Sequence, residues 1–178
     1  MLLSLPGPDA VVAVVQEMES SLSNGDILID LTTSTPGTTE AVANQLCQRD
    51  VAVLGAPVSG GPSGAADGTL AVMVGGDPAV FERHHDLFDT IGETIIHVDG
   101  RPGHGHAMKL AYNYLSFVAM ICTSEVVVLG EQVGLDPETM IELFKVILEQ
   151  IRLINVEDID PLVPCPAELR HPVWYSMS

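Results

Sequence analysis

Residues 26–58 read DILIDLTTSTPGTTEAVANQLCQRDVAVLGAPV, and this stretch decides the fold class. Asp26 to Leu31 form a nearly continuous apolar run, which is typical of a strand in a sheet that is covered on both faces. Thr35-Pro36 supplies an N-cap and a first-turn proline for a helix that extends to about Arg49. A second buried strand follows over residues 51–58. The stretch therefore predicts two strands joined by a crossover helix.

The same alternation continues on both sides of this unit. A short strand over residues 2–5 and a helix from Asp9 to about Ser20 precede it. After a loop rich in Gly, Ser and Pro, we expect a strand over 69–75, a helix from Asp77 to about Thr90 and a last strand over 94–98. The order β-α-β-α-β-β-α-β predicts an α/β sheet with right-handed crossovers between parallel neighbours.

Past Gly103 only helical patterns remain. One apolar pattern extends from about His106 to Val133, and another helix begins at Asp136-Pro137 and extends to about Gln150. Since the first helix is apolar nearly all round, we expect other helices or a second copy of the chain to bury it. We predict regions 1–103, 104–150 and an irregular, proline-containing tail over 151–178.

Composition narrows the function classes. The chain has 24 acidic and 7 basic residues and a formal net charge of -17, which disfavours nucleic acids and anionic membranes as partners. The scarcity of lysine beside many carboxylates is typical of a halophilic protein, with an ordinary acidic protein as the alternative. Three widely separated cysteines and no signal-peptide pattern favour a reducing cytoplasm. The apolar run over 110–129 contains Asn113 and Glu125, so we expect a buried helix and not a membrane span.

Ser59-Gly60-Gly61 follows the strand that ends at Val58. Glycines let backbone N–H groups approach a ligand, and the serine adds a hydroxyl, so this turn could hold a carboxylate. A plain tight loop is the alternative. The segment continues with small residues to Leu70.

Lys109 and Asn113 lie four residues apart, on one face of the long predicted helix. A lysine at the start of an apolar helix can also simply extend to solvent. The preceding Gly103-His104-Gly105-His106 lacks the complete dinucleotide glycine pattern, so we interpret it as a helix entry. We expect its histidines, like His84 and His85, to be surface or loop residues that bind no metal.

Residues 56–70 and 103–113, in this order, resemble the signatures of the β-hydroxyacid dehydrogenases, the family of 3-hydroxyisobutyrate dehydrogenase and tartronate semialdehyde reductase, related to 6-phosphogluconate dehydrogenase. The resemblance covers roughly residues 1–148. It implies an α/β fold: the C-terminal half of a Rossmann-like doubly wound sheet, followed by a truncated all-α domain with one long helix. Residues 1–103 would be a partial dinucleotide-binding domain, and 104–150 the start of a helical substrate and dimerisation domain.

The resemblance also implies roles. Lys109 would be the general acid/base, Asn113 its hydrogen-bonding partner, and Ser59, Gly60 and Gly61 the carboxylate site. The cofactor would be NAD or NADP, and the sequence does not distinguish between the two. Its nicotinamide half would lie near Leu5, Pro6 and Thr33. The reaction would transfer a hydride between this cofactor and a small 3-hydroxy acid or semialdehyde.

The family's glycine-rich opening has no counterpart in this sequence, and the C-terminus diverges from the family. We therefore expect a fragment, which a start codon assigned too late, a broken gene or pairing with a separate N-terminal half would explain, and the sequence leaves open whether it is inactive alone. The long helix predicts a homo-oligomer. The alternatives are a non-catalytic remnant, an oligomerisation module, or a carboxylate-binding module without redox chemistry.

Overall fold

The computed structural model describes residues 1–151, with side chains through Val146. The predicted tail lies, apart from its first residue, outside these residues. The chain divides into two compact units, Met1–Phe117 and a second unit that begins at Val118. The predicted domain boundary after residue 103 stays a prediction.

The first unit contains a six-stranded mixed sheet of order β1-β2-β3-β5-β4, in which β6 also pairs with β5. Its strands are β1 (Leu2–Leu3), β2 (Ile27–Asp30), β3 (Ala52–Gly55), β4 (Val58–Ser59), β5 (Leu70–Gly75) and β6 (Gly92–Asp99). The pairs β1/β2, β2/β3 and β5/β6 are parallel, whereas β5 is antiparallel to β3 and β4. The predicted α/β sheet is confirmed. The antiparallel junctions arise because the connection from β4 to β5 is too short for a parallel crossover.

The helices follow the sequence patterns with two differences. They are α1 (Pro8–Met18) with a 3-10 turn after it (Glu19–Ser21), α2 (Pro36–Cys47), α3 (Gly61–Asp67), α4 (Pro78–Arg83), α5 (His85–Asp89), α6 (Pro102–Gln132) and α7 (Pro137–Ile151). The predicted loop rich in Gly, Ser and Pro contains the helix α3. This helix begins at Gly61-Pro62 and has Gly68 as its C-cap, and because these residue types are also typical of turns the sequence did not predict a helix here. The single helix predicted from Asp77 is two helices, which meet at His84.

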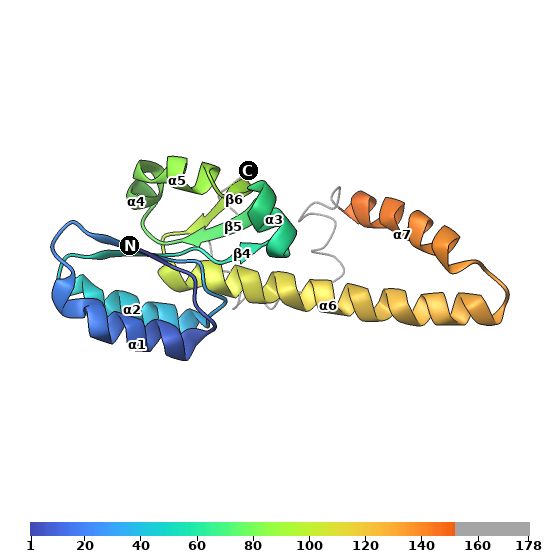
Figure 1. Cartoon of the computed structure of the whole chain (residues 1–178), viewed down its shortest axis with the longest axis horizontal. Helices are drawn as coiled ribbons and strands as arrows, with labels where there is room; N and C mark the ends of the chain where they lie inside the picture. The colour runs from blue at the N-terminus through green and yellow to red at the C-terminus, as the bar shows by residue number, and fades with distance from the viewer. Residues whose placement is uncertain (152–178) are drawn as a thin grey trace, which may run out of the picture. The chain divides into compact units, whose positions relative to one another are not determined.

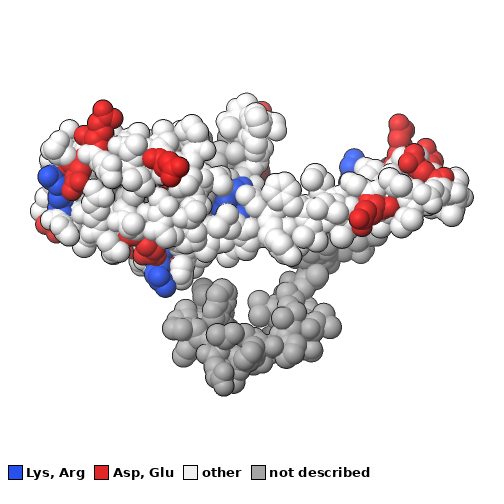
Figure 2. Space-filling model, turned by 90° about the horizontal axis from the view of Figure 1, so that it is seen from below, with Lys and Arg blue, Asp and Glu red and all other residues white. Residues whose placement is uncertain are grey.

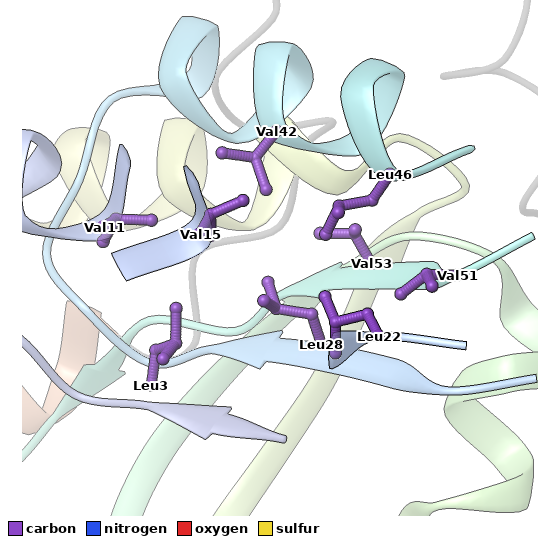
Figure 3. Close-up of a cluster of buried hydrophobic side chains, with 9 residues drawn as sticks. All are labelled: Leu3, Val11, Val15, Leu22, Leu28, Val42, Leu46, Val51 and Val53. Atoms are coloured by element: carbon purple, nitrogen blue, oxygen red, sulfur yellow. The ribbon is translucent and has the colours of Figure 1, made fainter. Parts of the chain in front are cut away.

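Two apolar clusters show that both faces of the sheet are covered (Figure 1). Leu28 and Val53 pack beneath α1 and α2, in the cluster of Leu3, Val11, Val15, Leu22, Leu28, Val42, Leu46, Val51 and Val53 (Figure 3). Their neighbours Ile29 and Leu54 face the opposite side, where Phe81 of α4 and Phe88 of α5 are buried. The run of apolar residues in β2 is thus explained by burial on both sides.

The long helix α6 exposes much of its apolar surface. Its exposed apolar side chains include Tyr114, Leu115, Phe117, Met120, Ile121, Val126, Val128 and Leu129. By length and composition α6 could cross a membrane, which is weak evidence on its own. The expected burial by other helices is not found among the described residues, and burial by a second copy of the chain stays a prediction. Elsewhere, on the face that Figure 2 shows, carboxylates lie in separate groups.

Candidate active site

The ends of β1 and β2 bring the predicted cofactor residues to one edge of the sheet. The backbone N–H of Leu5 donates a hydrogen bond to Thr32 Oγ1 at 3.0 Å, which joins the segments that follow the two strands. Thr33, the next residue, is exposed, and so is Pro6 beside Leu5. Leu5, Pro6 and Thr33 therefore lie close to one another, as a shared site requires.

The predicted carboxylate site follows β4. Because β3 and β4 are both antiparallel to β5, the chain continues from β3 into β4 in the same direction and leaves Ser59 half-buried at its end. Gly60 and Gly61 have φ angles of 131° and 64°, a backbone region that favours glycine. The two glycines are thus required by the turn from β4 into α3.

The start of α6 packs directly on the sheet, backbone against backbone. A Cβ atom added to Gly105 would lie 2.1 Å from the carbonyl oxygen of Gly55, and one added to Gly75 would lie 2.6 Å from the Gly105 nitrogen. The interpretation of Gly103-x-Gly105 as a helix entry is confirmed, since α6 begins at Pro102. These glycines allow the close approach that places the next two turns of α6 beside the sheet.

Lys109 is buried two turns into α6, with 7% of its surface exposed. Its Nζ lies 5.2 Å from the centre of the Tyr112 ring, one turn further along the helix. Burial lowers the pKa of Lys109, partly opposed by the Tyr112 hydroxyl, whose negative charge when ionised would raise it. No carboxylate of the described residues forms an ion pair with this amine. The amine is therefore poised to lose its proton more readily than an exposed lysine does.

Tyr112 lies near both this lysine and Ser59 of the predicted carboxylate site. A hydrogen bond from the Ser59 hydroxyl lowers the pKa of Tyr112, burial acts in the opposite direction, and Ser116 and Lys109 lower it further. The structure thus brings Ser59 and Lys109 to the same side chain from two different elements. Asn113 is half-buried on the next residue of α6. The sequence reasoning did not single out Tyr112, although its spacing from Lys109 places the two on one helix face.

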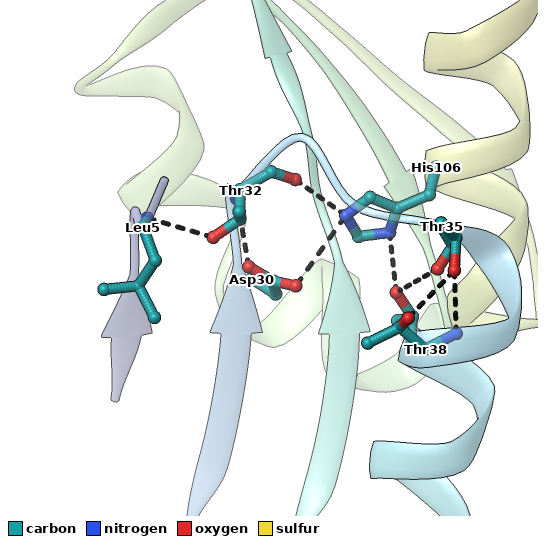
Figure 4. Close-up of polar contacts among 7 residues, drawn as sticks. Leu5, Asp30, Thr32, Thr35, Thr38 and His106 are labelled. Carbon is teal, nitrogen blue, oxygen red and sulfur yellow. Dashed lines mark hydrogen bonds and ion pairs between the residues drawn. The ribbon is translucent and has the colours of Figure 1, made fainter. Parts of the chain in front are cut away.

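His106 corrects a prediction. The sequence pattern predicts a surface or loop histidine at this position, but the side chain is completely buried. Its Nε2 lies 2.9 Å from the carbonyl oxygen of Thr32, its Nδ1 lies 2.9 Å from Thr39 Oγ1, and Asp30 Oδ2 lies 3.7 Å from Nε2 (Figure 4). A helical repeat over residues 106, 109 and 113 was the signal for its inward direction. By contrast, His104 is partly exposed and pairs with Asp99.

The edge formed by β1 and β2 fits the nicotinamide half of a dinucleotide, which presents an aromatic ring and a polar amide. Leu5 offers a half-buried apolar side chain and Thr33 an exposed hydroxyl. The neighbouring Ser34 hydroxyl is buried and has no hydrogen-bond partner among the described residues. A buried hydroxyl without a hydrogen-bond partner costs free energy. A polar group of a bound ligand would supply the missing partner.

Two family models match the chain. The model of the NAD binding domain of 6-phosphogluconate dehydrogenase matches residues 1–100, and the model described as NAD-binding of NADP-dependent 3-hydroxyisobutyrate dehydrogenase matches residues 103–147. Both models are named for NAD binding, in agreement with the predicted NAD or NADP cofactor.

Curated relatives and solved structures agree with these models. The chain is 38% identical to 2-(hydroxymethyl)glutarate dehydrogenase from Eubacterium barkeri, over 79% of this chain and 47% of that protein. It is 38% identical to 3-hydroxyisobutyrate dehydrogenase from Pseudomonas aeruginosa, over 67% of this chain and 40% of the relative. The structure of Mycobacterium tuberculosis 3-hydroxyisobutyrate dehydrogenase with L-serine aligns with a TM-score of 0.74 at 29% identity, over 80% of this chain and 48% of that one. The chain thus spans about half the length of the relatives that it matches.

Proposed function

We propose that this chain, which belongs to the β-hydroxyacid dehydrogenase family, forms the catalytic part of an NAD(P)-dependent dehydrogenase. Its substrate would be a small 3-hydroxy acid or the matching semialdehyde. The observation that carries the proposal is the arrangement around Tyr112, whose ring centre lies 5.2 Å from the buried amine of Lys109 and whose pKa is lowered by the nearby Ser59 hydroxyl. Ser59 can hold a carboxylate and Lys109 can exchange a proton, so the two groups suit the two ends of such a substrate.

The relatives' names support this substrate class. A carboxylate and a hydroxyl on the third carbon are common to 3-hydroxyisobutyrate and 2-(hydroxymethyl)glutarate, which name two of the relatives. L-Serine, present in the aligned mycobacterial structure, has the same arrangement. We assign the carboxylate to Ser59 with Gly60 and Gly61, and the hydroxyl to Lys109 with Asn113 as a second hydrogen-bonding group.

In the oxidation direction, neutral Lys109 accepts the proton of the substrate hydroxyl through its Nζ atom. The bound nicotinamide would supply the redox chemistry by exchanging a hydride with the carbon that bears this hydroxyl. In the reduction direction, protonated Lys109 returns the proton to the carbonyl oxygen. Burial favours this use of a lysine, because it disfavours the charged form and brings the pKa closer to the working pH. Leu5, Pro6 and Thr33 would hold the nicotinamide half.

The proposal is tested with the two lysines of the chain. Turnover of 3-hydroxyisobutyrate would be measured with NAD and with NADP. The protein used would contain the full chain together with any sequence that flanks it. Lys109→Ala should reduce turnover by about a hundredfold or more, while the control Lys145→Ala leaves it unchanged. Equal turnover in the two variants would exclude Lys109 as the acid/base.

The carboxylate site has its own test. Ser59→Ala should weaken the binding of 3-hydroxyisobutyrate by about tenfold, as expected for a lost hydrogen bond to a charged group. Ser63→Ala, which alters an exposed serine of α3, is the matched control. If both variants bind alike in a calorimetric titration, Ser59 does not hold the carboxylate.

We further propose that a second copy of the chain covers the exposed apolar face of α6, giving a homo-oligomer that works in a salt-rich cytoplasm. The exposure of this face supports oligomerisation, and the net charge of -17 supports adaptation to salt. Light scattering at low and at molar salt tests the first point: a monomer at both would exclude pairing through α6.

A further inference from the structure

The buried side chain of His106 has no role in the proposed reaction, although it lies one turn before Lys109 on α6. Figure 4 shows its ring directed from α6 toward Thr32 and Asp30 at the end of β2. A histidine completely removed from water requires partners for its ring nitrogens, and three elements contribute them here: β2, the segment after β2, and α2.

The partners fix which ring nitrogen carries the proton. The carbonyl oxygen of Thr32 can only accept, so Nε2 must donate at this 2.9 Å contact. Burial lowers the pKa of His106, opposed by the hydrogen bond to Thr32 and by the charge of Asp30. In the neutral ring Nδ1 is an acceptor, and the Thr39 hydroxyl at 2.9 Å donates to it.

The same contacts form a continuous path to the cofactor edge. The backbone N–H of Thr32 donates to Asp30 Oδ1 at 3.0 Å, and Thr32 Oγ1 accepts from the backbone N–H of Leu5. Asp30 Oδ2 is buried and accepts no hydrogen bond from the described residues, with His106 Nε2 at 3.7 Å. The ring of His106 therefore joins the segment before Thr33 to the helix that carries Lys109.

We propose that His106 is a positioning residue, which holds the start of α6 against Thr32 and thereby sets the burial of Lys109 beside the edge that carries Leu5 and Thr33. This inference rests on the proposed role of Lys109 and adds the group that keeps its amine in place. His106 and Lys109 are three residues apart and face the same side of the helix, so release of the histidine lets the lysine move outward. Water would then reach the amine, and its charged form would regain hydration.

Two substitutions separate the contacts of the ring. In His106→Gln the amide nitrogen reaches the position of Nε2 and can still donate to Thr32. In His106→Asn the shorter amide reaches only the position of Nδ1, near Thr39. The two variants have the same functional group and differ in which contact they retain, so each serves as the control of the other.

The readout is the pKa of Lys109 in the full chain, followed by NMR with lysine labelled with ¹³C at Cε. The chain has only two lysines, and Lys145→Arg assigns their two signals. We expect Lys109 to titrate below its ordinary value of 10.5 in the unsubstituted chain. His106→Gln should stay close to that result, and His106→Asn should raise the pKa by about half a pH unit or more.

An unchanged Lys109 pKa in His106→Asn, or equal rises in both variants, would overturn the positioning role and leave the proposed function intact. A Lys109 that titrates at its ordinary value in the unsubstituted chain would instead contradict its role as the base. Should His106→Asn not fold, ¹⁵N NMR of the unsubstituted chain decides. A neutral His106 ring protonated at Nε2 supports the proposal, and one protonated at Nδ1 overturns it, because Thr32 cannot donate.

Discussion

Gly105→Ala should destabilise the fold strongly, because the start of α6 touches the sheet through this glycine. An added Cβ would lie 2.1 Å from the carbonyl oxygen of Gly55, 2.5 Å from that of Met73 and 2.9 Å from the Gly75 nitrogen. All three are backbone atoms of sheet strands, so the helix must withdraw by more than an ångström. Overpacking of this kind costs up to about 3 kcal/mol or somewhat more, and the better helix propensity of alanine returns about 1 kcal/mol. We expect a net loss of about 2 kcal/mol in the free energy of unfolding.

Gly37→Ala is the matched control for this substitution. Gly37 lies in α2, and an added Cβ there has no atom within 4 Å, so alanine should be neutral or stabilising by up to about 1 kcal/mol. Urea denaturation followed by circular dichroism measures both variants. If Gly105→Ala unfolds within about 0.5 kcal/mol of the unsubstituted chain, the close backbone contact does not position α6. The account of the Gly103-x-Gly105 pattern as a packing device would then be refuted.

Other properties give three further predictions. Tyr112→Phe should lower the pKa of Lys109 in the ¹³C titration, because it removes the hydroxyl whose charge opposes the effect of burial, whereas Tyr114→Phe, at a position 74% exposed, should leave it unchanged. Equal values in the two variants would show that the Tyr112 hydroxyl does not act on the amine. The pKa of His106 is lower in the folded chain than in the unfolded chain, so below pH 6.5 the unfolded chain binds a proton that the folded chain does not. The free energy of unfolding should therefore not depend on this group above pH 6.5 and should fall by at most about 1.4 kcal/mol per pH unit below it. Urea midpoints of His106→Gln should therefore decline less steeply between pH 6.5 and pH 5, and parallel curves would contradict this. The melting temperature should rise in molar KCl, because salt screens the repulsion among the carboxylates; a fall would argue against halophilic adaptation.

The sheet could be predicted from the sequence because its signals are local. The apolar run of β2 and the Thr35-Pro36 helix start depend only on neighbouring residues, and the Thr35 side chain does cap α2 by accepting from the Thr38 N–H. The helix α3 was missed because its glycines and proline are also typical of turns. The antiparallel pairing of β5 was not predicted, although the short connection from β4 was its local signal, because the apolar pattern of a buried strand is the same for both directions.

The candidate site shows the same division between local and long-range information. Lys109 and Asn113 share one helix face at a fixed spacing, so their proximity follows from helix geometry alone. The proximity of Tyr112 to Ser59 and the hydrogen bond of His106 with Thr32 each involve residues from different elements, and both depend on how closely α6 approaches the sheet. That approach is set by glycines whose role is visible only once the facing carbonyl oxygens are placed. Gly105 is therefore needed because its lack of a side chain lets α6 bring an amine to the sheet.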